Sequence, residues 1–143
     1  MTQEWEIKMI ALAQYGGRNL DRSLAEQLVR VYVEGWKEYN STKILTTLDP
    51  ACILIESDGE IFRGAEKIIR EVEKRIAGEY GPWQISRWEI TTLAVADEVC
   101  FLEWIFEGRR SFEGASLIRY KESKISYVRE YCTTGTLWES SEG

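Results

Sequence analysis

Histidine is absent from this sequence of 143 residues. Its absence excludes catalysis by Ser-His or Cys-His pairs, and it removes the commonest protein ligand of catalytic metal ions. Proton transfer would therefore depend on glutamate, aspartate, tyrosine, lysine or cysteine side chains. The sequence also contains no motif for a metal ion or an organic cofactor, and we expect neither.

Cysteine, positive charge and long apolar runs are scarce as well. Cys52, Cys100 and Cys132 lie far apart without a CxxC spacing, which is typical of reduced, buried thiols in a cytoplasmic protein. The apolar run near the N-terminus is short and follows two glutamates, so we expect no signal peptide and no membrane span. The net charge of −6 argues against nucleic acid or an anionic membrane as the partner.

The length predicts a single domain over residues 1–143. Within it we expect a helical extension over 1–20, a main body over 21–134 and a tail over 135–143. The main body begins with an amphipathic helix that has Tyr32 on its apolar face. At the start of this helix Ser23 and Glu26 have the spacing of a capping box, and Gly35 within it suggests a close approach of another backbone segment.

The rest of the chain is richer in β structure. A strand over 51–57 runs into an Asp-Gly turn and a short return strand, which is a strong signal for a hairpin. A helix follows Gly64, with Glu71 and Arg75 expected to pair on its exposed face. After this helix come four segments rich in β-branched and aromatic residues: "WQISRWEITTLAV", "EVCFLEWIF", "SFEGASLIRY" and "KISYVREYC". Helices, a hairpin, a helix and then four strands indicate an α+β fold.

Three stretches carry a resemblance to a known family: "YVEGWKEYNSTKILTTLDPACILIES", "FRGAEKIIREV" and "GASLIRYKESKISYVREY". Together they resemble the nuclear transport factor 2-like superfamily, the cone fold of SnoaL-like polyketide cyclases and ketosteroid isomerases, over residues 23–134. The resemblance implies a cone-shaped α+β barrel with a curved antiparallel sheet wrapped around N-terminal helices. This superfamily contains several kinds of enzyme and also proteins without catalysis, so the fold alone leaves the function open.

The resemblance also implies candidate site residues. Ketosteroid isomerases have a tyrosine on the first long helix and a general-base aspartate at the end of the first strand. These two positions fall on Tyr32 and Glu56 here. Their third residue, a protonated aspartate that helps to bind the developing oxyanion, falls on Ser116, which can donate a hydrogen bond but is a different group.

Strand alternation supports a pocket position for Glu56. It shares strand parity with Cys52 and Leu54, so it should point where they point. The alternative is a solvated carboxylate at the end of a strand. Tyr32 would need a hydrogen-bond partner for a buried hydroxyl, whereas Trp36, one helical turn further on, is either a core residue or part of the ligand site.

Two further carboxylates could lie either in the pocket or outside it. Glu130 alternates with Val128 on the last strand, and it becomes a second pocket carboxylate if the Val128 face is the inner one. Two carboxylates in one dry cavity would have their pKa values pushed apart, which suits acid–base chemistry. The alternative for Glu130 is a salt bridge at the rim. Glu103 is a weaker candidate of the same kind, and Trp104 is a candidate for the pocket lining.

These features together lead to two hypotheses. In the first, the chain binds an apolar or aromatic small molecule and transfers a proton next to a carbonyl, as an isomerase or cyclase does. In the second, it is a non-catalytic ligand-binding or dimerisation module. We further expect a homodimer through the outer sheet face, where Leu117, Arg119, Tyr127 and Arg129 would suit an interface.

Overall fold

The structure is a computed structural model that describes residues 3–14, 21–81, 85–108 and 111–133. The expected tail over 135–143 lies outside these residues. In the described part, four helices and six strands follow one another along the chain, with the helices mostly first and the strands mostly last. The fold is therefore α+β, as the sequence predicts.

The helices are α1 (Glu4–Gln14), α2 (Arg22–Lys37), α3 (Ser41–Thr47) and α4 (Ala65–Ile76). None of the described helices is long and apolar enough to cross a membrane. At the start of α2 the Asp21 carboxylate accepts a hydrogen bond from the Leu24 amide at 2.9 Å. The expected capping box at Ser23 and Glu26 is wrong, because the helix begins earlier and Asp21 already satisfies this free amide.

Gly35 lets α2 and α3 approach closely. A Cβ atom at this position would lie 2.7 Å from Cγ1 of Ile44 and 3.1 Å from its backbone nitrogen. No larger residue fits without a shift of α3, so the close approach expected from the sequence is confirmed. The approach fixes the direction in which α3 leads into the first strand.

The six strands form one sheet in the order β2-β1-β6-β5-β4-β3. Most neighbours are antiparallel, including β4 with β5, but β1 and β6 are parallel, with Leu54 opposite Val128. The curved, mainly antiparallel sheet that the sequence predicts is therefore present, and β1 with β6 is the one parallel pair among the described strands. The strands are β1 (Leu48–Ile55), β2 (Ile61–Arg63), β3 (Ile85–Ala96), β4 (Val99–Gly108), β5 (Ser111–Lys121) and β6 (Lys124–Cys132).

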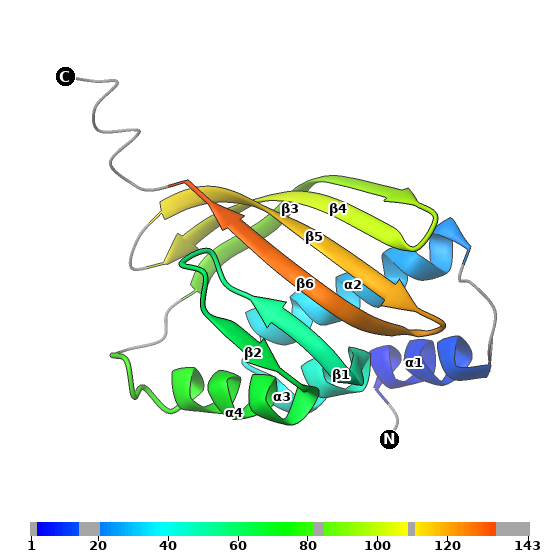
Figure 1. Ribbon diagram of the computed structural model, residues 1–143, viewed down its shortest axis with the longest axis horizontal. Helices are drawn as coiled ribbons and strands as arrows, with labels where there is room; N and C mark the ends of the chain where they lie inside the picture. Colours follow the sequence, from blue (N-terminus) through cyan, green and yellow to red (C-terminus); the bar gives the residue numbers. More distant parts are fainter. Residues whose placement is uncertain (1–2, 15–20, 82–84, 109–110, 134–143) are drawn as a thin grey trace.

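The sheet is curved and has one covered face. Figure 1 shows α2 running behind the strands, with α4 beside the β1–β2 hairpin. We call the face toward α2 the inner face and the opposite one the outer face. The largest fully buried side chains lie between α2, its neighbours and the inner face, among them Leu28, Ile44, Leu54, Leu102, Ile118 and Ile125.

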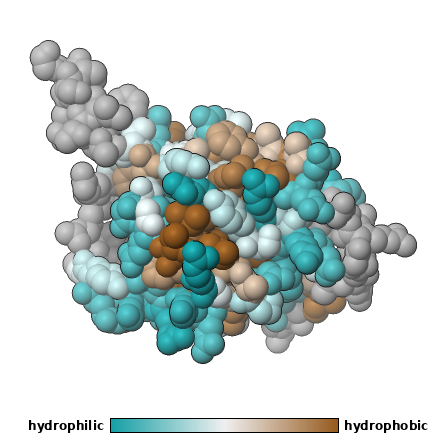
Figure 2. Space-filling view, in the orientation of Figure 1, coloured by the Kyte–Doolittle hydropathy of each residue, from teal (hydrophilic) through white to brown (hydrophobic). Residues whose placement is uncertain are grey.

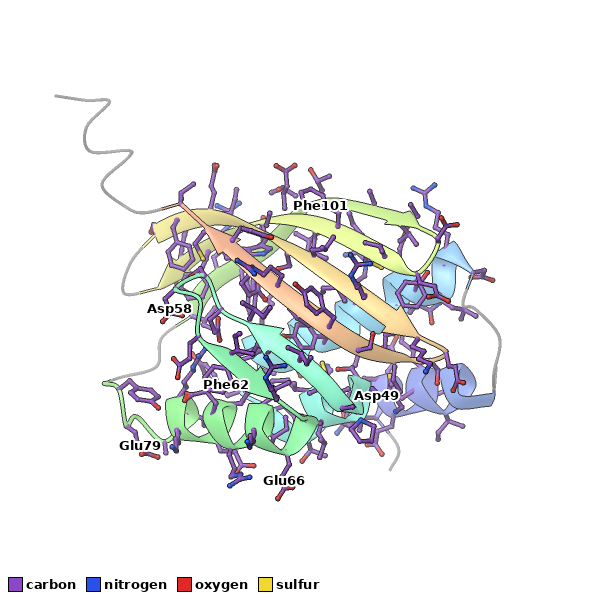
Figure 3. All side chains as sticks on the ribbon, viewed as in Figure 1. Asp49, Asp58, Phe62, Glu66, Glu79 and Phe101 are labelled. Carbon is purple, nitrogen blue, oxygen red and sulfur yellow. The ribbon has the colours of Figure 1, made fainter. Side chains whose placement is uncertain are left out.

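The outer face carries apolar side chains without helices over them. Phe101 is 41% exposed and Tyr131 is 52% exposed. Figure 2 shows hydrophobic residues gathered on this side among polar ones, and Figure 3 labels Phe101 there. Both faces of the described part of the sheet therefore carry large apolar side chains.

Candidate functional site

The inner face brings together side chains from four elements. Tyr32 comes from the middle of α2, Glu56 follows the end of β1, Ser116 lies on β5 and Glu130 lies on β6. Residues that alternate with them are buried, such as Val128 at 1% exposure, which places Glu130 on the inner side. The sequence positions are far apart, so only the curved sheet and the buried helix α2 can bring these groups close to one another.

A chain of two hydrogen bonds ends at Glu130. The indole Nε1 of Trp104 donates to Ser116 Oγ at 2.9 Å, and Ser116 Oγ donates to Glu130 Oε2 at 2.5 Å. Ser116 and Glu130 lie directly opposite each other in the β5–β6 pair. Cross-strand neighbours have Cβ atoms only about 4.5–5.5 Å apart, so this register brings the serine and the carboxyl group into contact.

Burial favours the protonated form of the Glu130 carboxyl group near neutral pH. It raises the pKa of Glu130 from 4.5 to about 8, since the charged form loses its hydration. Hydrogen bonding from Ser116 and the charge of Arg75 lower this pKa, while Glu56 raises it. At pH 7 the group is therefore mostly protonated and able to donate a hydrogen bond.

The hydroxyl group of Tyr32 is buried beside these carboxyl groups. Tyr32 is 2% exposed, and its Oη makes no hydrogen bond of good geometry with a described residue, although the Trp36 side chain lies within weak hydrogen-bonding reach. Burial, followed by the nearby Glu130, raises the pKa of Tyr32 well above its usual value, although the Trp36 indole lowers it. The hydroxyl keeps its proton, and a buried donor without a partner is costly unless something binds to it.

Glu56 is partly buried and paired rather than solvated. Its Oε1 accepts a hydrogen bond from Arg75 Nη2 at 2.7 Å. The hairpin turn holds the backbone here, because the Gly59 amide donates to the Glu56 carbonyl at 2.8 Å. The side chains with the same parity, Cys52 and Leu54, are buried, so the strand alternation placed Glu56 correctly on the inner side.

Arg75 is a site residue that the sequence reasoning missed. The expected Glu71–Arg75 pair is present, with Glu71 Oε2 3.7 Å from Arg75 Nε, but the expectation that it lies on an exposed face is wrong, because Glu71 is only 9% exposed. The guanidinium carbon of Arg75 also lies 5.7 Å from the centre of the Trp36 ring. The signal was present, because both residues share helical spacing with the apolar positions Ile68 and Val72.

Aromatic rings line the inner face next to these polar groups. Trp36 contacts Trp88 edge to face at 6.4 Å between ring centres, and Trp88 contacts Trp104 in the same way at 5.7 Å. Phe106 and Phe112 continue the cluster, stacked at 4.8 Å. Rings in such contacts form an apolar wall along the inner face.

Of two further expected pocket residues, Glu103 lies on the outer face and Val128 lies in the core of the inner side. Glu103 is exposed on the outer face, next to Phe101, so its assignment to the pocket is wrong. Val128 lies on the inner side as expected, and its side chain is part of the core. On the outer face, Arg119 lies over the Tyr127 ring at 5.8 Å and Arg129 over the Tyr131 ring at 5.2 Å.

Within the described residues, no group of three or more carboxylate or thiol side chains could hold a metal ion. The thiols are also unreactive in character. Burial raises the pKa of Cys52 and of Cys100 to about 12, so both remain protonated. The chemistry of the site therefore belongs to its carboxyl, hydroxyl, guanidinium and indole groups.

Comparison with known proteins identifies the fold. No family model matches the chain, and no curated protein matches it. Solved structures do match, at low sequence identity. A protein of unknown function with a cystatin-like fold from Methylobium petroleophilum PM1 is 20% identical, with a TM-score of 0.69, over 82% of this chain and 80% of that one.

Two further structures carry the fold descriptions. A nuclear transport factor 2-like protein of unknown function from Cytophaga hutchinsonii ATCC 33406 is 11% identical, with a TM-score of 0.64, over 79% of this chain and 93% of that one. A protein with a ketosteroid isomerase-like fold from Catenulispora acidiphila DSM 44928, in complex with trimethylamine, is 18% identical, with a TM-score of 0.63, over 73% of this chain and 83% of that one. The chain has this cone fold, as its sequence predicts.

Proposed function

We propose that this chain, built on the nuclear transport factor 2-like cone fold, binds an apolar or aromatic small molecule that carries a carbonyl or hydroxyl oxygen. The observation that supports this most directly is the buried hydroxyl of Tyr32, which lies beside Glu130 and has no described hydrogen-bond partner beyond a weak contact with Trp36. A ligand oxygen would complete this donor. The aromatic wall of Trp36, Trp88 and Trp104 would hold the apolar part of the ligand.

We further propose that the bound molecule loses and regains a proton next to its carbonyl group, as in an isomerisation or cyclisation. Glu56 is the base, because its Oε2 is not engaged by Arg75, which donates to Oε1. Tyr32 and the protonated Glu130 donate hydrogen bonds to the enolate oxygen. Donors that are already in place where negative charge develops stabilise such a transition state strongly.

Glu130 supplies the acid that the resemblance locates at Ser116. In ketosteroid isomerases that position holds a protonated aspartate, and a serine cannot replace its acidity. Glu130 lies directly across the β5–β6 pair from Ser116, and burial raises its pKa to about 8. A carboxylic acid that is neutral at pH 7 is therefore present one strand away from the expected place.

A second candidate function is a binding protein without catalysis. The ion pair between Arg75 and Glu56 favours it, because Arg75 Nη2 lies 2.7 Å from Glu56 Oε1 and occupies one of the two oxygens that could accept a proton. The ring-to-ring contacts of the aromatic wall favour it as well, since these rings partly fill the inner face. Both functions share the same ligand chemistry and differ only in turnover.

Binding is tested first, with 2-naphthol as a planar probe whose oxygen can accept the donors. Calorimetry should detect binding to the native protein, and Tyr32→Phe should weaken it by about tenfold, which corresponds to one hydrogen bond. Glu103→Gln, on the outer face, is the matched control and should bind normally. Tetramethylammonium is a second probe, since aromatic rings and carboxylates also attract such cations. Failure of 2-naphthol to bind the native protein contradicts the proposal.

Catalysis is tested by hydrogen–deuterium exchange. The protein is incubated with 2-tetralone in deuterated buffer, and exchange at the carbon next to the carbonyl is followed by NMR. Glu56→Gln keeps the shape and removes the base, so the exchange catalysed by the protein should fall by roughly 10²-fold or more. Binding of 2-naphthol without any catalysed exchange would favour the binding protein over the enzyme.

A further inference from the structure

We propose that Trp104 is a positioning residue for Glu130, and that it acts through Ser116. Its indole N–H fixes the rotation of the Ser116 hydroxyl, which then donates its own proton to Glu130 Oε2 and leaves Oε1 to carry the acidic proton. The catalytic meaning of this arrangement rests on the proposed function, whereas the order of the hydrogen bonds rests on the geometry alone.

The direction of the two hydrogen bonds follows from what each group can do. An indole N–H can only donate, so Ser116 Oγ accepts from Trp104 at 2.9 Å. Ser116 is 2% exposed, and Glu130 is its one other hydrogen-bond partner among the described residues. If Glu130 donated to the serine instead, the hydroxyl proton of Ser116 would be buried without an acceptor, at a substantial cost.

The position of the Trp104 ring is fixed on both sides. Trp104 lies opposite Gly114 in the β4–β5 pair, and a Cβ atom on Gly114 would be 2.4 Å from Cη2 of the ring. The same Cβ would lie 2.7 Å from the Tyr131 carbonyl oxygen, so the backbone could not easily yield. Phe112 contacts the ring at 5.8 Å and Trp88 at 5.7 Å. The packed ring therefore holds the indole N–H in one direction, toward Ser116 Oγ.

The groups around Glu130 determine the pH at which its carboxyl group loses its proton. Glu56 raises its pKa from the end of β1, and Arg75 lowers it from α4. Tyr32 of α2 and Cys132 of β6 also lie close to it. Burial, with a smaller effect of the nearby Glu130, raises both of their pKa values, so both groups keep their protons. Against this background Ser116 is the one uncharged group that lowers the pKa of Glu130. Trp104 controls that contribution without contacting Glu130 itself.

The test measures the protonation of Glu130 directly in ligand-free protein. The carboxyl carbon of Glu130 is followed by ¹³C NMR from pH 5 to pH 10 and assigned with Glu130→Gln. In Ser116→Ala the midpoint should rise by about one pH unit, because a hydrogen bond to the charged form is lost. In Trp104→Phe it should rise in the same direction by a smaller amount. Trp5→Phe, the same change in a tryptophan of α1 that makes no ring contact with Trp104, should leave the midpoint unchanged.

The double variant separates an action through Ser116 from a direct effect of the ring. If Trp104 works only through the serine, Trp104→Phe should add nothing once Ser116 is alanine, and the two shifts should not sum. Additive shifts would overturn the proposal, as would an unchanged midpoint in Trp104→Phe. Circular dichroism checks that each variant is folded.

The native protein provides an independent readout in case the tryptophan variant unfolds. The ¹H–¹⁵N signal of the Trp104 indole should shift with pH at the same midpoint as Glu130, since its acceptor is bonded to that carboxyl group. The indole signal of Trp88 should not follow this midpoint. Independence of the Trp104 signal from the Glu130 titration would overturn the proposal. None of these measurements needs a substrate, so a failure of the proposed function would leave their outcome intact.

Discussion

Arg75 and Glu56 form an ion pair in which Nη2 and Oε1 lie 2.7 Å apart. Arg75 comes from α4, and Glu56 comes from the turn between β1 and β2. The pair therefore joins the helix to the β1–β2 hairpin. Each side chain is about one-fifth exposed, at 21% and 19%. The pair therefore sets both the position of the proposed base and the electrostatic balance around Glu130.

Removal of Arg75 should raise the pKa of Glu130 further. The guanidinium charge lowers that pKa in the native protein, so Arg75→Gln should move the ¹³C titration midpoint of Glu130 above about 8. Arg70→Gln is the matched control, because Arg70 lies on the same helix and pairs with the exposed Glu66. Its midpoint should equal that of the native protein. An unchanged midpoint in Arg75→Gln would show that the charge is screened from Glu130.

Glu130 should make the protein less stable as the pH rises. Its pKa is about 8 in the folded state against an ordinary value of 4.5, so the folded state binds more protons between these values. The free energy of unfolding then decreases as the pH rises from about 4.5 to about 8. Glu130→Gln should remove this decrease and should be more stable than the native protein at pH 8.5 by an amount on the order of a few kcal/mol.

Urea unfolding at pH 5 and pH 8.5 measures this difference. Glu103→Gln is the control, because Glu103 is exposed on the outer face. It should follow the native pH dependence closely. If Glu130→Gln and the native protein lose the same stability between the two pH values, the Glu130 carboxyl group is hydrated in the folded state, and its proposed role as an acid fails with it.

The sequence predicts which face a side chain lies on where a single periodicity, either helical spacing or strand alternation, determines that face. Helical spacing placed Tyr32 on the buried face of α2, and strand alternation placed Glu130 with Val128. The same rule failed for Glu103, because β4 has large apolar residues on both faces. Alternation gives two sets of residues and does not say which set faces the helix when both are apolar.

The contacts between site residues depend on register and on long-range packing. Ser116 lies opposite Glu130 only because the β5–β6 pair has a register shift between Arg119 and Tyr120. A shift of one residue would have turned the serine away from the carboxyl group. Arg75 reaches Glu56 from 19 residues away along the chain, and only the docking of α4 against the hairpin brings them together. No local pattern in the sequence encodes either contact.

Tyr32→Phe should stabilise the ligand-free protein. The Tyr32 hydroxyl is buried with no more than a weak contact to the Trp36 side chain, so its removal relieves a desolvation cost of about 1 kcal/mol. Tyr120→Phe is the matched comparison: Tyr120 is equally buried at 2% exposure, but its hydroxyl donates to the Asp97 carbonyl. That variant should lose about 1 kcal/mol in urea unfolding. Equal losses in both would mean that the Tyr32 hydroxyl is already satisfied.

We propose that two copies of the chain associate through their outer sheet faces. Phe101 and Tyr131 are exposed there, and the arginines at positions 119 and 129 lie over tyrosine rings. Aromatic and arginine side chains are enriched at protein interfaces, and a stable interface buries about 800 Å² on each partner. Light scattering at micromolar concentration should therefore give about twice the chain mass of 16.6 kDa.

A charge placed on this face should separate the two copies. Phe101 lies opposite Leu117 in the β4–β5 pair, so Phe101→Glu would bury an unpaired carboxylate in the proposed interface, which is costly. Its mass should fall to that of a single chain, while circular dichroism stays unchanged. Ile10→Glu on α1 is the control, because Ile10 is 55% exposed but lies on a helix rather than on the sheet. A native protein with the mass of one chain would refute the dimer, and a loss of association in Ile10→Glu alone would move the interface to α1.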